Sequence, residues 1–175
     1  LEVAAARSGL AGRIETVGAS MEAPPLEENA LDAIWSEGAI YCMGFEAGVA
    51  EWRRFLKPGG VLAVSELTWL TAERPAELQD HWDREYPAVA TASAKVASLE
   101  RLGFSPIGYF PLPERCWLAN YYAPLRRRFP AFLERHGGSE AARALVATEE
   151  AEIALYERHR RFVSYGFYVA RKIGA

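Results

Sequence analysis

The sequence is poor in cysteine: Cys42 and Cys116 are the only two thiols among 175 residues. They lie far apart and lack the close pairing that is typical of structural zinc sites. We interpret them as reduced thiols of a cytoplasmic protein, with a disulfide as the less favoured alternative. The three histidines, at positions 81, 136 and 159, are scattered over predicted helices, so no metal site is predicted.

Long apolar runs are missing as well. No stretch reaches the ~18 residues that a membrane-spanning helix needs, and no secretory segment is visible. The net charge of -3 argues against nucleic acid as the main partner, because phosphate binding requires a basic face. The one dense basic run, Arg126–Arg128, is interpreted as a solvated helix end. The length and the ordinary globular composition predict a single domain.

A glycine-rich nucleotide loop is absent ahead of the first strand–helix unit. A nicotinamide-dependent oxidoreductase would need such a motif after a strand, which makes that activity a weak hypothesis. No nucleophile elbow and no phosphate-binding loop are present either. The chain opens at Leu1 without a methionine, and residues 1–10 read as the last turns of a helix that stops at Gly12.

What the sequence does contain is a clear strand–helix–strand unit. Leu31–Trp35 is predicted as a strand, Gly44–Leu56 as an amphipathic helix and Val61–Ser65 as a strand buried on both faces. A crossover of this kind is right-handed and makes the two strands parallel. Ligands of open α/β sheets bind beyond the carboxyl ends of such strands, so the turn Trp35–Gly38 is a candidate site.

Elsewhere the chain mixes strands and helices. The alternating stretch Arg13–Val17 predicts a further strand, and the acidic, proline-containing segment Glu22–Ala30 predicts a surface loop. The last two strands are expected to pair antiparallel at one sheet edge. The remaining predictions are helices at Pro75–Tyr86, Thr91–Leu102, Ala123–His136 and Ser139–Arg161, and strands at Phe104–Phe110 and Phe162–Ala170.

Three segments carry a resemblance to a known family. They are Glu15–Met21 (ETVGASM), Leu31–Glu37 (LDAIWSE) and Leu56–Gly60 (LKPGG), the last leading into a strand of small residues. In their order and spacing, the chain resembles the second half of a class I S-adenosylmethionine-dependent methyltransferase. It is most similar to the small-molecule enzymes of the ubiquinone-biosynthesis-like type.

The resemblance implies an α/β fold with a Rossmann-like methyltransferase sheet. That sheet is expected to be mostly parallel, with an antiparallel C-terminal edge strand, and to be truncated at the N-terminus. Residues 1–175 would form one partial methyltransferase domain, in which 70–103 and 111–161 are helical insertions that cover the substrate.

The same resemblance implies S-adenosyl-L-methionine as cofactor. Ser20 and Met21 would flank the adenine ring; read from the residues alone, they are a turn cap and a core side chain. Trp35, Ser36 and Glu37 would bind the cofactor near its methyl group, where backbone carbonyls and a carboxylate favour a cationic sulfonium.

Catalytic roles are assigned by this resemblance to Glu37 and Tyr41. Glu37 would take a proton from the acceptor or hold an amine, and Tyr41 would line the mouth of the site. The alternatives are a loop acid that pairs with an arginine, and an ordinary packed aromatic.

Substrate contacts are expected from Glu66 and Trp69, which end the second crossover strand, and from Trp117 and Tyr121. Aromatic faces beside a carboxylate suit a cationic amine through cation–π attraction. Core packing is the competing explanation for these aromatics. Further candidates for the same lid are Trp82, Tyr86 and Tyr122.

The family's first strand with its glycine-rich loop, and the acid that binds the ribose, have no counterpart in this sequence. We therefore expect the chain to be a piece of a longer enzyme, and to bind the cofactor poorly and lack activity alone. The missing strands would leave the edge of Leu31–Trp35 open. The edge could instead pair with a second copy of the chain, or Arg13–Gly18 could move to fill the gap.

Two functions follow as hypotheses. The first is methyl transfer from S-adenosylmethionine to a nucleophile of a small metabolite. The second is a methyltransferase-like scaffold without activity in this form, acting through protein association or as a strand-exchanged homodimer. No nucleic-acid or membrane partner is expected.

Overall fold

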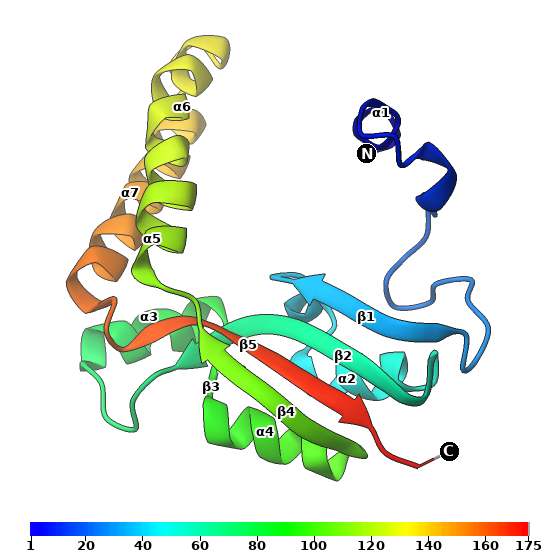
Figure 1. The fold of residues 1–175 in the computed structure, drawn as a ribbon. Helices are drawn as coiled ribbons and strands as arrows, with labels where there is room; N and C mark the ends of the chain where they lie inside the picture. The colour runs from blue at the N-terminus through cyan, green and yellow to red at the C-terminus, as the bar shows by residue number, and fades with distance from the viewer. Residues whose placement is uncertain (175) are drawn as a thin grey trace.

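The computed structural model describes residues 1–174 and is built on one five-stranded sheet (Figure 1). The path of the sheet is β1-β2-β5-β4, and β3 pairs with β2 beside that path. Neighbouring strands β1, β2 and β3 are parallel, whereas β5 is antiparallel to both β2 and β4. The strands are β1 (Leu31–Glu37), β2 (Leu56–Trp69), β3 (Ala90–Thr91), β4 (Phe104–Pro111) and β5 (Val163–Lys172).

This sheet confirms the predicted α/β, Rossmann-like class with one correction. All strands except β5 run in the same direction, as expected for a mostly parallel sheet. The C-terminal strand β5 is antiparallel, but it lies inside the sheet between β2 and β4 and not at its edge. The interior position suits its apolar sequence, because both faces of β5 are covered.

Helices α2 and α4 lie below the sheet in Figure 1. Helices α5, α6 and α7 rise above the left-hand end of the sheet in this view, and α1 stands apart. Thr91 and Ser139 cap helices α4 and α7: their hydroxyls accept the N–H groups of Ala94 and Ala142 at 3.3 Å. Within residues 1–174, no helix combines the length and apolarity that crossing a membrane requires. The helices are α1 (Glu2–Arg7), α2 (Phe45–Arg53), α3 (Ala76–Glu85), α4 (Ala92–Arg101), α5 (Glu114–Trp117), α6 (Ala123–Arg135) and α7 (Glu140–His159), with 3-10 turns η1 (Ala11–Arg13) and η2 (Ile40–Cys42) and a π-helical segment η3 (Leu118–Tyr122).

The β1–α2–β2 crossover is confirmed, and the Lys-Pro-Gly-Gly segment has a definite place in it. Leu31 pairs with Leu56 and Ala33 with Val61, so the chain between Leu56 and Val61 bulges out of the ladder. Gly59 has a φ of 78° there, and a Cβ on Gly60 would lie 2.9 Å from the Lys57 carbonyl oxygen. The bulge therefore requires glycine at both positions.

Two predicted boundaries were wrong. Helix α2 ends at Arg53 and does not reach Leu56, because the Arg54 and Phe55 carbonyls accept N–H groups from the chain that enters β1. Phe55 and Leu56 are buried in the same core as the helix, so the apolar pattern does not reveal where the helix stops. At the N-terminus, Gly12 lies within the turn η1 and does not follow α1 directly.

The predicted strand Arg13–Val17 does not form. The segment is extended but has no strand beside it, and Val17 is 53% exposed. A strand exists only through hydrogen bonds to a neighbour, so an alternating pattern without a partner stays an irregular segment. Residues 13–18 also do not move to the open edge of β1, whose only neighbour among the described strands is β2.

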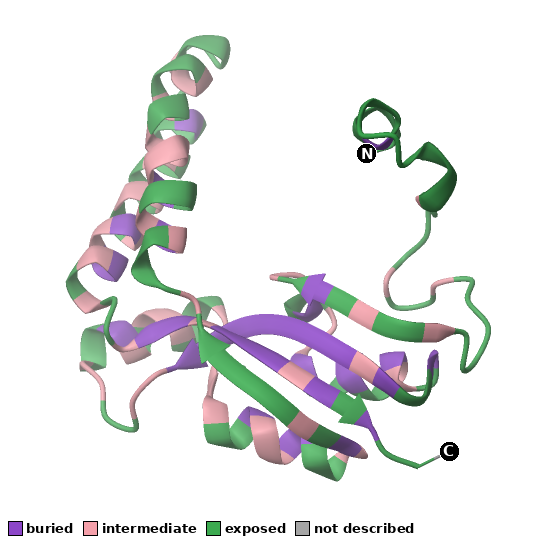
Figure 2. Cartoon of the chain, in the orientation of Figure 1, coloured by how far each residue is buried: buried purple, intermediate pink, exposed green. Residues whose placement is uncertain are grey.

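The main core lies between the sheet and the two helices below it. Val49 and Trp52 of α2, Val64 of β2 and Leu99 of α4 are all nearly inaccessible. The opposite face is less covered, as the green segments of β1 and β4 in Figure 2 show. Trp35, for example, is 70% exposed. The sheet therefore has one packed face and one partly open face.

A second cluster, under helices α3, α5 and α7, extends the core beyond the carboxyl ends of the strands. It includes Leu78 of α3, Trp117 of α5, Ile153 of α7 and Val163 of β5. The helical segments after β2 and β4 are thus held by apolar packing at the end of the sheet where α/β proteins bind ligands.

We expect Gly166 of β5 to be essential for the central ladder. A Cβ there would lie 2.7 Å from the Thr68 hydroxyl and 2.8 Å from both Tyr109 and Tyr168. Gly166→Ala should lower the free energy of unfolding by about 1–3 kcal/mol, as overpacking does in a filled core. Gly108→Ala in β4 is the matched control, since its nearest neighbour is 3.8 Å away. Equal urea midpoints for the two variants would contradict this prediction.

Candidate functional site

The turn that follows β1 is held in place by the next strand of the sheet. The Gly38 N–H donates to the Ser65 hydroxyl at 2.9 Å, one residue before Glu66. Gly38 has a φ of 53°, and a Cβ there would lie 3.5 Å from the Tyr165 hydroxyl. Glycine is favoured at this position because the left-handed backbone strains other residues. The turn is thus fixed relative to both β2 and β5.

On one side of this turn lies a cavity of about 410 Å³, here called the edge cavity. The Met21 carbonyl accepts the indole N–H of Trp52 at 3.0 Å, which anchors the loop that closes the cavity. The Ser36 hydroxyl is buried and has no hydrogen-bond partner within residues 1–174. The cavity is lined by Met21, Pro24, Leu26, Leu31, Ile34, Trp35, Ser36, Glu37, Ala39, Trp52 and Phe55.

The five residues predicted to bind the cofactor are only partly brought together. Met21, Trp35, Ser36 and Glu37 line the edge cavity, whereas Ser20 does not. The Ser20 hydroxyl accepts the Glu22 N–H at 3.2 Å, which is the turn-capping arrangement. The Trp35 indole donates to the Glu37 carboxylate at 2.6 Å, so the hydrogen-bond partner of Glu37 is an aromatic side chain and not an arginine.

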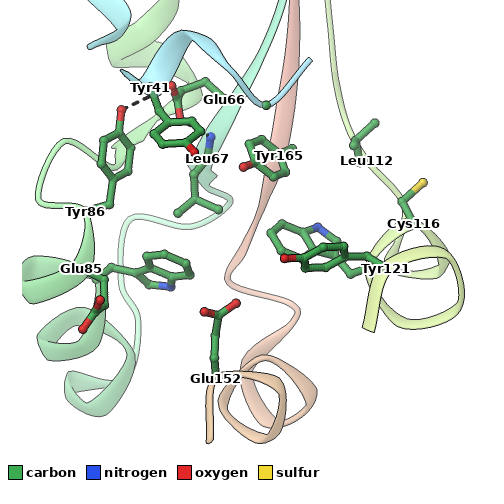
Figure 3. A pocket seen from close by; sticks show the side chains of 13 residues that line it. Tyr41, Glu66, Leu67, Glu85, Tyr86, Leu112, Cys116, Tyr121, Glu152 and Tyr165 are labelled. Carbon is green, nitrogen blue, oxygen red and sulfur yellow. Dashed lines mark hydrogen bonds between the residues drawn. The ribbon is translucent and has the colours of Figure 1, made fainter. Parts of the chain in front are cut away.

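On the other side of the turn lies a larger cavity of about 560 Å³, here called the aromatic cavity (Figure 3). It opens beyond the ends of β1 and β2 and is walled by residues from η2, α3, α5, η3, α7 and β5. Its lining combines six aromatic side chains with three carboxylates. The lining residues are Gly38, Tyr41, Glu66, Leu67, Trp82, Glu85, Tyr86, Leu112, Cys116, Trp117, Tyr121, Glu152 and Tyr165.

Glu66 is the most deeply buried acid of this cavity, with 1% of its surface exposed. Its carboxylate accepts the Leu67 N–H at 2.7 Å and the Tyr86 hydroxyl at 3.3 Å. Burial raises the pKa of Glu66, and the nearby Lys95 ammonium opposes that rise. A carboxylate held out of water in this way is suited to receiving a proton or to facing a cation.

Glu152 enters the cavity from α7, and Figure 3 shows its carboxylate pointing toward the space beside Tyr121. One of its oxygens accepts the Tyr122 hydroxyl at 3.0 Å. Burial raises the pKa of Glu152 above its ordinary range, while the Tyr122 hydrogen bond and the charge of His81 act in the other direction. The second oxygen has no partner among residues 1–174.

The aromatic walls are packed against one another. Tyr41 meets Tyr86 edge to face with ring centres 6.1 Å apart, and Trp117 stacks on Tyr165 at 5.2 Å. Tyr121 contacts the edge of Trp117 at 6.3 Å. Burial raises the pKa of Tyr165 to about 12, so its hydroxyl is protonated at neutral pH. These rings form a preassembled apolar surface around the acids.

The predicted substrate residues also separate into two places. Glu66, Trp117 and Tyr121 line the aromatic cavity together with the predicted catalytic residue Tyr41. Trp69 lies elsewhere: its side chain is buried, and the Arg74 guanidinium sits 4.2 Å above its ring. Glu37 lines the edge cavity only, so it does not meet Tyr41 in one cavity.

Sequence reasoning missed Glu152, Tyr165 and Leu112. The signal for Glu152 was present, because it lies one helical turn before the buried Tyr156 and therefore on the packed face of α7. Tyr165 lies in the C-terminal strand, and the sequence does not indicate which face of that strand lines a cavity. No local signal distinguishes Leu112. Residues 1–174 contain no group of three or more metal-ligating side chains.

The turn residues 37–39 border both cavities. Glu37 and Ala39 line the edge cavity, and Gly38 lines the aromatic cavity. The arrangement can hold two ligands at once on either side of one short segment. Two reactants placed in this way would meet at the carboxyl end of β1.

Comparison with known proteins agrees with this geometry. Residues 1–64 match the family model described as a methyltransferase domain. Malonyl-[acyl-carrier protein] O-methyltransferase from Enterobacter lignolyticus is 40% identical over 67 residues. This match covers 38% of the present chain and 26% of that relative, so the chain corresponds to a minor part of the relative's length.

Solved structures match over nearly the whole chain. A methyltransferase from Geobacter sulfurreducens, in complex with S-adenosyl-L-homocysteine, has a TM-score of 0.76 at 19% identity, over 97% of this chain and 68% of that one. The [4+2]-cyclase SpnF has a TM-score of 0.74 at 23% identity, over 99% and 61%. The phosphoethanolamine N-methyltransferase 2 of Haemonchus contortus has a TM-score of 0.67 at 16% identity, over 89% and 36%.

At these identities the solved structures establish the fold, and the family model adds the sequence relationship. The chain is thus similar to methyltransferase domains in sequence over residues 1–64, and it shares the Rossmann-like fold of S-adenosylmethionine-dependent methyltransferases of known structure.

Proposed function

We propose that this protein transfers a methyl group from S-adenosylmethionine to a nucleophilic atom of a small metabolite. The observation that carries the proposal is the turn at residues 37–39, which borders the edge cavity on one side and the aromatic cavity on the other. We assign the methyl donor to the edge cavity and the acceptor to the aromatic cavity, so that the two would meet across one turn.

The residues of the edge cavity fit part of this donor. Met21, Ile34 and Phe55 offer an apolar surface for the adenine ring. The unpartnered, buried Ser36 hydroxyl offers a hydrogen bond that nothing within residues 1–174 satisfies. We also propose that Trp35 and Glu37, which line the same cavity, bind the donor near its methyl group. The glycine-rich loop and ribose-binding acid of the family are absent from these residues, so we expect the chain alone to bind the donor weakly and to be inactive.

When bound, S-adenosylmethionine supplies an electrophilic methyl group on a positively charged sulfur. The protein's contribution is mainly to position the acceptor and to exclude water from the aromatic cavity. We propose that Tyr41 orients the acceptor from the mouth of that cavity, and that Glu37 adds a favourable negative field near the donor. Glu66 is a further candidate to receive a proton from the acceptor, because its carboxylate is buried there.

We also propose that the chain forms one partial methyltransferase domain, in which residues 70–103 and 111–161 cover the substrate. Within residues 111–161, Trp117, Tyr121 and Glu152 wall the aromatic cavity, which suits a lid over the acceptor. Within 70–103, α3 contributes Trp82 to the same wall, whereas α4 packs into the main core. A cavity of about 560 Å³ suits a small metabolite, in line with the small-molecule subgroup. The two free thiols accord with a reducing compartment such as the cytoplasm.

Calorimetric titration with S-adenosylhomocysteine tests the donor site, using the complete gene product that contains these 175 residues. We expect saturable binding, and we expect Ser36→Ala to weaken it about fivefold, the equivalent of one lost hydrogen bond. Ser105→Ala, at an exposed position of β4, is the control and should leave the affinity unchanged. Absence of any binding heat in the unmodified gene product would reject the proposal.

A buried acid kept for function should destabilise the fold at neutral pH. Burial raises the pKa of Glu66 above its ordinary value of 4.5, so the unfolded chain loses this proton at lower pH than the native chain does. Stability therefore falls as the pH rises from 4.5 toward the native pKa and stays reduced above it. Glu66→Gln should accordingly unfold at a higher temperature than the parent at pH 7, with the gap closing near pH 4.5.

Thermal unfolding followed by circular dichroism at several pH values measures this difference. Glu100→Gln removes the same charge from an exposed position of α4 and serves as the matched control. A Glu66→Gln variant that is less stable than the parent at pH 7 would show that the carboxylate has a net stabilising role.

The homodimer remains a proposal that rests on the open edge of β1. Trp35 is 70% exposed beside that edge, and unpaired strand edges favour pairing with another chain. Sedimentation equilibrium of the 175-residue chain should show a dimer that Trp35→Lys shifts toward the monomer. A monomer at all concentrations would exclude this association, and a monomer that also binds no partner protein would argue against the scaffold alternative.

A further inference from the structure

We propose that the methyl acceptor carries, apart from its nucleophilic atom, a positively charged nitrogen, which the aromatic cavity holds between its carboxylates and its aromatic rings. This inference rests on the proposed function, which makes the ligand of the aromatic cavity the methyl acceptor. The preference for a cation is argued from the cavity itself and is tested without the methyl donor.

The first argument is the balance of charge. Among the thirteen residues that line the cavity, three are glutamates and none is lysine, arginine or histidine. Glu66 and Glu152 come from different elements, β2 and α7, so the acids converge from two sides. A phosphate or carboxylate ligand would meet these groups without any compensating positive charge in the wall, which disfavours it strongly.

The second argument is that the acids lack full compensation from the protein. Burial raises the pKa of both Glu66 and Glu152, which means that their charged forms are poorly stabilised. Lys95 acts on Glu66 from α4, and His81 acts on Glu152 from α3, but both side chains lie outside the cavity lining. A cation inside the cavity would supply the missing partner directly.

The third argument is the chemistry of the walls. Tyr41, Tyr86, Trp117, Tyr121 and Tyr165 enclose the space with ring faces and edges, as the labelled tyrosines in Figure 3 illustrate. Aromatic faces attract ammonium groups, and the attraction grows when water is excluded. A neutral apolar ligand would use the rings but would leave the buried carboxylates unpaired. A cation uses both features at once.

One other cation could use the same surface, namely the sulfonium of the methyl donor. The edge cavity lies on the far side of the turn at residues 37–39, and Glu152 belongs to the aromatic cavity alone. We therefore assign the cation to the acceptor. The experiment separates these two possibilities by adding the donor.

The test compares choline with its uncharged analogue 3,3-dimethylbutan-1-ol, which has nearly the same shape. Titration of the complete gene product that contains these residues is followed by tryptophan fluorescence, which Trp117 and Trp82 at the cavity wall make sensitive to binding. We expect choline to bind at least about tenfold more tightly than the neutral analogue. Equal affinities, or tighter binding of the carboxylate 3,3-dimethylbutanoate, would overturn the proposal.

Two variants locate the site. Glu152→Gln should weaken choline at least about fivefold and leave the neutral analogue unchanged, because only the charge is removed. Tyr121→Leu should weaken choline about fivefold, whereas Tyr121→Phe should keep the affinity within about twofold, because the ring face is retained. Glu100→Gln is the control for loss of an exposed charge, and circular dichroism verifies that each variant is folded. Choline binding that none of the cavity variants alters would overturn the assignment.

The same titration with saturating S-adenosylmethionine distinguishes acceptor from donor. Unchanged or tighter choline binding supports the acceptor site, whereas competition between the two ligands would overturn it. Failure of the proposed function gives a different result: no binding of S-adenosylhomocysteine, with choline binding intact.

Discussion

The parallel pairing of β1 with β2 is the constraint on which both cavities depend. The register sets Glu37 opposite Ser65, so the next residue of β1's turn, Gly38, reaches the Ser65 hydroxyl and Glu66 follows immediately on β2. A shift of one residue would turn Ser65 away from Gly38 and bring Glu66 to the wrong face of the sheet. The glycine bulge at Lys57–Gly60 absorbs the unequal lengths of the two strands before this register begins.

The parts of the fold that the sequence predicts are those whose pattern is determined locally. Leu31–Trp35 and Val61–Ser65 read as strands because a helix and a turn between them complete one crossover, although β1 itself has only one buried residue, Ser36. Arg13–Val17 reads equally well as a strand, yet its state depends on a partner that its own residues cannot specify. The position of β5 inside the sheet is likewise a property of pairing, and a C-terminal location in the chain carries no information about it.

The candidate site, too, could be predicted from the sequence only in part. Glu66 and the turn after β1 could be predicted because strand ends in this topology face a common region. Which aromatic residues face the cavity could not, because Trp69 and Trp117 are equally apolar and differ only in what packs over them. No separate helix was predicted over residues 114–122, because a short helix runs there into a π-helical turn, which has no strong periodic signal.

The fold alone does not determine the reaction, so the acceptor has to be inferred from the residues that line the cavity. Among the solved structures with this fold, the names include a cyclase and methyltransferases of different acceptors, all below 25% identity. In this chain, a set of acids lies in an aromatic enclosure at the end of β2. Burial without a cation in the cavity wall raises the pKa of both Glu66 and Glu152, which opposes folding at neutral pH. Such a charge imbalance is explained when the missing positive charge belongs to the ligand. The specificity of this protein is thus expected to reside in the helical segments after β4, which supply Glu152 and Tyr121, and not in the sheet that it shares with its relatives.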